Sequence, residues 1–544
     1  MVARLWLWPA WLVTVVGALV TGYLGLREFV ATLEPGTYGT AWYAIAYYDL
    51  QLFVLSSNPL DQPGPYPLLL EIARFAAPAA AIWAIFEAGH ALFAGRYERW
   101  RISRRADNVI VVGATPAADV LAKKLHASSR RVIPVATGDP ESLRLAGAAK
   151  AEALYAFGDD SLDSAINLVT AARAAEMGAR RVYAQVSDSD LALALRARRL
   201  GLPDPGQRHV DVVHLDEVAA RALMRLDGPA ITTADAPSIL VVGPSAFGRA
   251  LVVELARTWR LASPGSFAKL PVTLVGDHAD VVARRLRQQW PVVDEVCDIT
   301  AVASLDEVAG PDPYRIYVCD DDEDRALLTV LSATRLWRGE PHSLVVRLGR
   351  LATYRSVFSG DGGWLLDDIG QRLRLVGLTE LASDPDLIRQ DLVERLAQTI
   401  HERYLIGQLQ AGATPGVGAI KPWPDLDEKF RRSNRMQAVD IGRKLQKIGC
   451  TVAPSSSKGA PFSYVGDELE RLSRHEHARW CQERTDAGWK RGERDDANKR
   501  HPDLVPWDEL TEKSRNNDRQ VIRDLPIVLA EAGLRVIRLT DPPA

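Results

Sequence analysis

The chain has 544 residues, of which 47% are hydrophobic and 25% are charged. This composition is typical of globular protein, and the length predicts roughly three to four domains. A formal net charge of −3 excludes a broadly basic nucleic-acid-binding protein, so no nucleic acid is expected as a partner. The four cysteines have no C-x-x-C spacing, which argues against a disulfide framework or a zinc ribbon and favours a reducing compartment.

The N-terminal region, residues 1–105, is predicted to be an α-helical transmembrane domain. Residues 5–26 contain no charged side chain, and a helix of that length extends about 33 Å, enough to cross a bilayer. A second apolar stretch, at about 70–95, is the other expected span. A signal peptide is the alternative for the first stretch, but its apolar run is longer than a typical signal and no small-x-small cleavage site follows.

The charges on either side of the second span predict its orientation. Five arginines lie between Arg96 and Arg105 with a single acid among them, whereas residues 27–72 hold one arginine and five acids. Cytoplasmic loops carry the excess of Lys and Arg. Both termini and the large C-terminal region are therefore expected in the cytoplasm, as parts of a multi-pass protein of the inner membrane, with the lipid bilayer as a partner.

Two features of this domain bear on function. A short helix at about 41–57 is too polar for a span and is expected to be re-entrant or interfacial. Two spans around such a helix suit a pore, and a membrane anchor with an extracellular cap fits equally well. Glu87 and His90 lie one helical turn apart in the second span and are candidates for a functional membrane site; the alternative is that they face a partner helix.

Beyond residue 105, strands alternate with helices, which is the pattern of parallel-sheet α/β folds. The pattern begins twice with a buried strand, a glycine-containing turn and a helix. It predicts a first Rossmann-like lobe at residues 106–230 (lobe 1) and a second at residues 236–385 (lobe 2).

The turns indicate which lobe could bind a dinucleotide. The G-x-G-x-x-G fingerprint needs glycines for a tight turn, for the approach of the pyrophosphate and for helix packing. Lobe 2 keeps the first and third glycines and has an acid where the ribose-binding acid is expected, whereas lobe 1 keeps only the first glycine. If either lobe binds a nucleotide, we expect lobe 2 to do so; the alternative is an empty or anion-filled crevice. The candidate cofactor-binding residues are Gly243, Ser245, Gly248 and Asp277 in lobe 2, and Gly113 and Thr115 in lobe 1.

Two spans, an arginine-rich linker and the segments NVIVVGA (108–114) and SILVVG (238–243) together resemble the TrkA-N/RCK family, the cytoplasmic sensor domains of potassium channels and transporters. The segment VDVVHLDEVAARAL (210–223) is similar to the end of that family's first lobe. The resemblance covers about residues 105–380. It implies domains that bind nucleotides or ions and dimerise to gate a membrane partner, so a homo-oligomer formed through the lobes is expected.

Residues 386–544 contain an internal duplication. Residues 394–404 align with 470–480, and residues 422–449 align with 506–533, so that each copy reads as a helix, a loop with Pro-Trp and a helix. Leucine and aromatic positions follow helical spacing. We therefore expect the two copies to pack as a pseudo-symmetric α-helical pair.

The second copy has eight extra residues between these blocks, within AGWKRGERDDANKRHP (487–502). Its G-W pair, R-D-D-x-N-K-like loop and H-P-x-L-x-P segment resemble the ryanodine-receptor repeat (RyR) domain, and the first copy resembles a degenerate partner with Ala413 in place of the tryptophan. The resemblance implies a cytosolic recognition module rather than an enzyme.

The side chains of this loop could recognise a small nucleotide-like ligand. Tryptophan can stack a base, Arg and Lys can contact phosphate, and carboxylates can accept hydrogen bonds from a ribose or an exocyclic amine. An NAD-like or other adenine-containing molecule is therefore expected near Trp489; the alternative is core tryptophans beside a self-satisfied salt-bridge turn. The candidate ligand-binding residues are Trp489, Arg494, Asp495, Asp496, Asn498, Lys499, Trp507 and Arg519.

The predicted fold class is multidomain: an α-helical transmembrane hairpin, two α/β Rossmann-like parallel-sheet lobes and a C-terminal α-helical RyR repeat pair. No catalytic motif or metal-ligand spacing is present, so neither an enzyme nor a metal site is expected. The leading hypothesis is a ligand-gated membrane protein, a nucleotide-sensing channel-like or membrane effector controlled by its cytoplasmic domains. The alternative is a membrane-anchored regulatory sensor without a pore, acting on a separate transporter.

Overall fold

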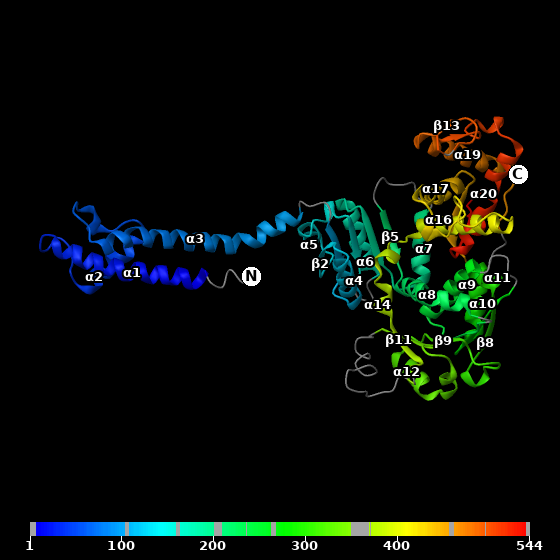
Figure 1. Cartoon of the computed structure of the whole chain (residues 1–544), viewed down its shortest axis with the longest axis horizontal. Helices are drawn as coiled ribbons and strands as arrows, with labels where there is room; N and C mark the ends of the chain where they lie inside the picture. The colour runs from blue at the N-terminus through cyan, green and yellow to red at the C-terminus, as the bar shows by residue number, and fades with distance from the viewer. Residues whose placement is uncertain are drawn as a thin grey trace. The chain divides into compact units, whose positions relative to one another are not determined.

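The computed structural model describes residues 7–103, 108–158, 164–200, 209–234, 237–262, 268–349, 369, 371–455, 462–495 and 497–539; the side chains at 7–10, 89–103 and 209 are outside this description. The chain forms two compact units, Met1–Ile102 and Ser103–Ala544. Each unit is described separately below (Figure 1).

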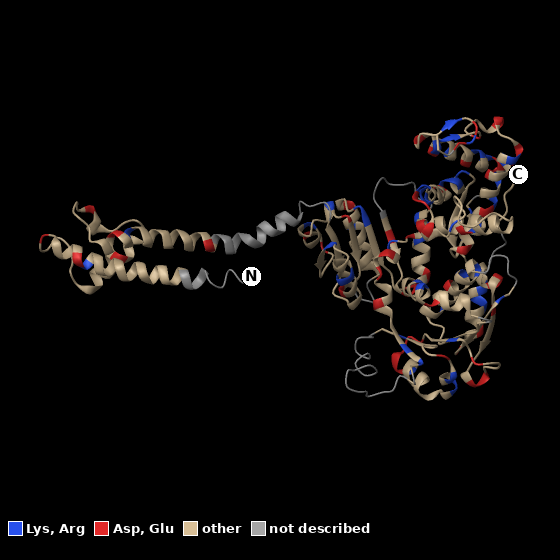
Figure 2. Ribbon diagram, viewed as in Figure 1, with Lys and Arg blue, Asp and Glu red and all other residues tan. Residues whose placement is uncertain are grey.

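The first unit contains two long apolar helices that pack together, as predicted. They are α1 (Leu7–Thr32) and α3 (Leu68–Ser103). The stretches Trp11–Thr32 and Leu68–Ala88 are long and apolar enough to cross a membrane, and Figure 2 shows few charged residues along them. Both helices run past the spans predicted at 5–26 and 70–95, because charged residues end an apolar stretch without ending a helix.

Small residues let the neighbouring elements approach α1 closely. A Cβ atom at Gly25 would lie 2.4 Å from the backbone nitrogen of Leu70, at the start of α3. A Cβ at Gly22 would lie 1.9 Å from a carboxylate oxygen of Asp49. Asp49 belongs to the short helix α2 (Trp42–Leu52) and is buried. The helix predicted at 41–57 therefore ends earlier, and one of its faces packs against α1.

The candidate membrane-site residues both lie in α3. Glu87 is half-buried, whereas the side chain of His90 lies outside the described residues. Whether the two act together in a site stays a prediction.

The second unit begins with the five-stranded parallel sheet of lobe 1. Its strand order is β2-β1-β3-β4-β5, and the buried apolar runs that predicted strands form its centre. Helix α4 (Pro116–Ala127) follows the first strand, and α6 (Ser164–Met177) and α7 (Ser189–Leu200) follow the third and fourth. The strands are β1 (Asn108–Val112), β2 (Arg131–Val135), β3 (Ala153–Ala156), β4 (Arg181–Gln185) and β5 (His209–Val213).

Lobe 2 is a six-stranded parallel sheet with the order β11-β10-β9-β6-β7-β8. This is the doubly wound order of dinucleotide-binding folds, and its switch point lies between β6 and β9. Both predicted parallel sheets are thus confirmed. The strands are β6 (Ile239–Val242), β7 (Leu270–Val275), β8 (Cys297–Val302), β9 (Arg315–Val318), β10 (Leu344–Leu348) and β11 (Leu373–Gly377).

The two lobes exchange helices. Helix α8 (Leu215–Thr233) follows the last strand of lobe 1 but packs along α9 (Ala246–Ala262) of lobe 2. Its buried Asp227 accepts a hydrogen bond from the Tyr317 hydroxyl at 2.8 Å and pairs with Arg374 at 2.6 Å. In return, α14 (Leu378–Ala382) follows the last strand of lobe 2 and packs against α4 and α8. One continuous apolar core joins the lobes.

The C-terminal region is helical, as predicted, and a strand from each copy of the duplication also pairs. Val452 lies opposite Val536 in the antiparallel pair formed by β12 (Cys450–Pro454) and β15 (Leu534–Arg538). These two residues are equivalent positions, 84 residues apart in the duplication. A pseudo-two-fold axis therefore passes between them. The helices are α16 (Leu392–Gln410), α17 (Glu428–Val439) and α18 (Ile441–Gln446) in the first copy, and α19 (Glu468–Asp486) and α20 (Glu512–Glu531) in the second.

Candidate functional site

The glycine-containing turn of lobe 2 is a tight turn between β6 and α9. Gly243 has φ +67°, and a Cβ there would lie 3.0 Å from the backbone of Asp320. A Cβ at Gly248 would lie 3.2 Å from Cys319, so this glycine serves the packing of α9 on the sheet. The Ser245 hydroxyl lies 3.4 Å from the amide of Gly248. Asp277 is exposed just past β7.

Acidic side chains lie beside this turn. Asp320, at the end of β9, pairs with Arg325 at 2.7 Å, and Asp321 and Asp322 follow it in the chain. Each of the last two also has a partner: Asp321 pairs with Arg347 at 3.3 Å, and the Asp322 side chain caps the helix α12 (Glu323–Ser332). Nucleotide binding by the lobe 2 residues stays a prediction.

The turn of lobe 1 is closed by its own side chains. Gly113 has φ +136°, and a Cβ there would lie 2.0 Å from the carbonyl oxygen of Phe157. The buried Thr115 hydroxyl donates to that same oxygen at 2.9 Å and accepts from the amide of Ala118 at 3.1 Å, which caps α4. An internal partner thus occupies the helix end that would otherwise meet a phosphate.

The predicted loop in the second copy is internally satisfied. Asp495 accepts hydrogen bonds from the backbone and the side-chain amide of Asn498 at 3.0 and 2.7 Å. The Lys499 ammonium donates to the carbonyl of Ala487 at 2.9 Å. Asp496 lies outside the described residues. Arg494 is exposed and is engaged in a contact.

The tryptophans of this copy have different environments. Trp489 is half-buried, and the Arg484 guanidinium lies over its ring at 4.9 Å. Trp507 is buried, and its ring nitrogen donates to Glu470 at 3.1 Å. Arg519 pairs with the same Glu470 at 2.8 Å. Trp507 and Arg519 thus hold the two helices of the copy together, and Trp489 retains the geometry of a stacking residue.

Equivalent histidines in the two copies have different environments. His401 and His477 each contact a backbone carbonyl, at 2.7 and 2.8 Å. Burial lowers the pKa of His401. Burial also opposes charge on His477, but its hydrogen bond to Asp518, at 3.1 Å, helps raise its pKa to about 10. The first copy has Asn434 at the position of Asp518.

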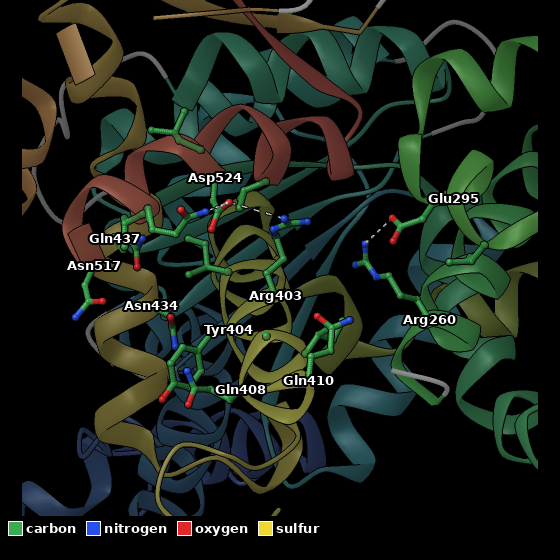
Figure 3. A pocket seen from close by; sticks show the side chains of 18 of the residues that line it. Arg260, Glu295, Arg403, Tyr404, Gln408, Gln410, Asn434, Gln437, Asn517 and Asp524 are labelled. Carbon is green, nitrogen blue, oxygen red and sulfur yellow. Dashed lines mark hydrogen bonds and ion pairs between the residues drawn. The ribbon is translucent and has the colours of Figure 1, made fainter. Parts of the chain in front are cut away.

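A large pocket lies between lobe 2 and the repeat pair, and the sequence did not predict it (Figure 3). Its volume is about 1300 Å³. Ring faces come from Trp259 and Tyr404, and basic groups from Arg260, Lys269 and Arg403. The pocket also gathers six amide side chains, which can each donate and accept hydrogen bonds. These are Gln408, Gln410, Asn434, Gln437, Asn517 and Gln520.

This pocket lies across the pseudo-two-fold axis. Three equivalent pairs, with members 84 residues apart, line it from both copies: Gln437 with Val521, Ile441 with Leu525, and Lys444 with Val528. The first member of each pair comes from α17 or α18 and the second from α20. The two copies therefore form the pocket together, and neither could form it alone.

Ion pairs join the lobe 2 wall of the pocket to the helical wall. Glu531, which is 3% exposed, pairs with Arg260 at 2.8 Å and with Arg403 at 2.9 Å. As Figure 3 shows, Arg403 also faces Asp524, at 3.8 Å, and Arg260 faces Glu295, at 4.0 Å. These ion pairs engage Arg260 and Arg403, so the amides, the rings and Lys269, which donates to the carbonyl oxygen of Asp294 at 2.7 Å, are the groups left to recognise a ligand.

The chemistry of the remaining clusters does not point to a metal site. Within the described ranges, no group of three or more His, Cys, Asp or Glu side chains could hold a metal ion.

Comparison with known proteins confirms the expected RyR domain: residues 464–538 match the RyR domain family. The matched segment is the second copy of the duplication. Solved structures of the GsuK channel also match at low identity. The ADP-bound form is 17% identical, with 72% of this chain and 98% of that chain covered and a TM-score of 0.34. A structure titled GsuK channel is 15% identical, covering 70% and 98%, with a TM-score of 0.35. The NAD-bound form is 13% identical, covering 72% and 84%, with a TM-score of 0.34.

Proposed function

We propose that the chain is a ligand-sensing membrane protein, in which an adenine-containing, nucleotide-like molecule binds the pocket between lobe 2 and the repeat pair and controls the membrane unit. The observation that carries this proposal is the pocket itself, about 1300 Å³ in volume and shared by lobe 2 and both copies of the duplication. Most small-molecule sites measure about 300–1,000 Å³, so this one has room for a dinucleotide.

The lining suits a nucleotide better than an apolar ligand. Side chains of Asn and Gln match the donor and acceptor pattern of a base edge, and adenine pairs with an amide through two hydrogen bonds. Trp259 and Tyr404 offer ring faces for stacking, worth about 1–3 kcal/mol per base. Lys269 is exposed at the lobe 2 wall and can meet a phosphate.

A ligand in this pocket would contact lobe 2 and both copies of the duplication at once. It would therefore favour an arrangement in which lobe 2 and the repeat pair close around it over one in which they lie further apart, because a ligand shifts an equilibrium by its difference in affinity for the two states. Only residues 104–107 separate the end of α3 from β1 of lobe 1. A change of arrangement in the lobes therefore acts on the helix that enters the membrane.

Two helices cannot enclose a conducting path, so a pore would require several copies of the chain. We propose a homo-oligomer assembled through the lobes, with both termini in the cytoplasm. The arginines that follow residue 95 support this orientation.

An anchored sensor without a pore is the second candidate, and the exposed face of α2 favours it. Trp42, Tyr43 and Tyr47 are each more than half exposed there. Aromatic rings of this kind lie at membrane–water interfaces, which suits a cap on an anchor. In this case the sensor would act on a separate transporter.

Calorimetry on the full chain in detergent tests the proposal with AMP, ADP, NAD and a cyclic nucleotide. We expect one of them to bind, and Gln437→Leu to weaken it about 3- to 10-fold, because one hydrogen bond contributes about 0.5–1.5 kcal/mol. Gln482→Leu is the matched control, since Gln482 is exposed and pairs with Asp486. Binding of none of the four, or equal affinities in the two variants, would contradict the proposal.

A further inference from the structure

A second, smaller cavity lies where lobe 1, lobe 2 and the first copy of the duplication meet. Its volume is about 70 Å³, which is room for roughly six water molecules or one phosphoryl group. Helices α7 and α9 and the helix α10 (Ala279–Gln289) supply most of its lining, and Arg395 of α16 completes it. The cavity shares no lining residue with the larger pocket.

Arginines are in excess around this cavity. Glu217 accepts from Arg196 at 2.7 Å and from Arg395 at 3.3 Å, so two guanidinium groups share this carboxylate, and the buried Asp211 adds a second negative charge near both. The Nε of Arg395 is buried without a hydrogen-bond partner among the described residues. Burial and the neighbouring Arg196 lower the pKa of Arg395 to about 9. Arg221, also close by, directs its side chain to a backbone oxygen and to Gln390 rather than to a carboxylate.

Two further lining groups have unused hydrogen-bonding capacity. Half-buried Arg249 makes no ion pair within 4 Å in the part of the chain that the structure describes, although the buried Asp216 interacts with it at longer range. His214 is 2% exposed, and its Nδ1 has no partner among the described residues. Its Nε2 faces the carbonyl oxygen of Ser187 at 3.1 Å and a carboxylate oxygen of Asp216 at 3.8 Å, so Nε2 carries the hydrogen in the neutral ring. The Nδ1 atom is then free to accept from a hydroxyl, or to donate when the ring is protonated.

The remaining charged groups of the lining are already paired. Arg285 pairs with Asp190, and Arg257 with Glu254, both at 2.5 Å. The lining thus holds four arginines against three acids, and Arg249 is the arginine with no carboxylate in direct contact among the described residues. A partly buried cation with no contacting counter-charge is unfavourable, and a bound anion would supply one.

We infer that this cavity binds a phosphoryl-sized oxyanion, held by Arg249, Arg395 and His214. Hydrogen phosphate matches the set, since its oxygens accept from guanidinium groups and its hydroxyl can donate to Nδ1 of His214. Three separate parts of the chain would share one ligand, so its binding would hold the lobes and the repeat pair together. The anion is either inorganic phosphate or the phosphate of a nucleotide.

Calorimetry on the full chain at fixed ionic strength, with inorganic phosphate and AMP titrated separately, tests this site. We expect saturable binding of at least one of them. Arg249→Gln should weaken it about ten- to a hundredfold, because a hydrogen bond to a charged group contributes about 1.5–3 kcal/mol. Arg284→Gln is the matched control, since exposed Arg284 on the same helix as Arg285 pairs with Asp280 and does not line the cavity.

The two titrations distinguish inorganic phosphate from a nucleotide as the source of the anion. Binding of phosphate alone identifies the free ion, and tighter binding of AMP identifies a nucleotide. The inference is overturned if neither binds, or if Arg249→Gln and Arg284→Gln bind with equal affinity. Arg249 makes no direct ion pair among the described residues, so its substitution should preserve the fold, and a thermal melt of each variant checks this. Gln437→Leu should leave this binding unchanged, which separates it from the larger pocket.

Discussion

Glu531 is the residue through which lobe 2 and the helical region should stabilise each other most strongly. It pairs with Arg260 and Arg403 at 2.8 and 2.9 Å, and its backbone oxygen accepts from Arg257 at 2.6 Å. The substitution Glu531→Gln keeps the size of the side chain and removes its charge. Two arginines are then left with weaker partners, at 4.0 Å in Glu295 and 3.8 Å in Asp524.

Breaking a buried ion pair from one side costs about 3–5 kcal/mol, and we expect about 3 kcal/mol for Glu531→Gln because each arginine keeps a second acid. The matched control is Glu295→Gln, which removes a 63% exposed partner of the same Arg260 and should cost at most about 1 kcal/mol.

Chemical denaturation of the full chain, followed by tryptophan fluorescence, measures both losses. Trp259 and Trp290 lie near this junction and report on it. Losses that are equal in the two variants, or below about 1 kcal/mol for Glu531→Gln, would refute the argument that this buried pair joins the two parts.

Gly25→Ala should destabilise the helix pair by about 1–3 kcal/mol through overpacking against Leu70, whereas Gly17→Ala should be tolerated, since a Cβ there meets nothing within 4 Å; thermal unfolding in detergent compares them. Burial raises the pKa of the Glu402 carboxyl from 4.5 to about 7. The folded protein therefore binds the carboxyl proton more strongly than the unfolded chain does, and the free energy of unfolding falls as the pH rises from about 4.5 to about 7. Glu402→Gln should flatten this dependence and, at pH 8, stabilise the protein by up to about 3 kcal/mol in urea titrations. Trp489→Ala should leave nucleotide affinity within twofold by calorimetry, because Trp489 does not line the pocket between lobe 2 and the repeat pair; a loss of about 5- to 150-fold would instead place the ligand at that loop.

The sheets could be predicted because their strands are buried on both faces and read as short apolar runs. NVIVV (108–112) and ILVV (239–242) are examples, and both form central strands. Strand β8 (Cys297–Val302) is harder to predict because it lies at the sheet edge and alternates polar with apolar residues. The strand pair at the pseudo-two-fold axis is harder still, because its partners lie far apart in the chain.

The candidate sites were harder to predict because a pocket is formed by segments that lie far apart in the chain. Motifs mark local chemistry, so the turn at Gly243 and the loop at Trp489 could be proposed from the sequence, and binding at either stays a prediction; within that loop, Asp495 and Lys499 already hydrogen bond to the loop itself. The larger pocket draws on segments at 259–296, 400–444 and 517–528. The feature of the sequence that points to this pocket is the duplication, because residues 84 positions apart in the two copies line the pocket from opposite sides of the two-fold axis.

The most direct test of the central claim is a density map of the full chain in lipid nanodiscs with saturating ADP. We expect density for the base between Trp259 and Tyr404, within reach of Gln437, and a change in the spacing of lobe 2 and the repeat pair relative to the ligand-free protein. Density for ADP in the crevice beside Gly243 or against Trp489, with the pocket between lobe 2 and the repeat pair empty, would contradict it.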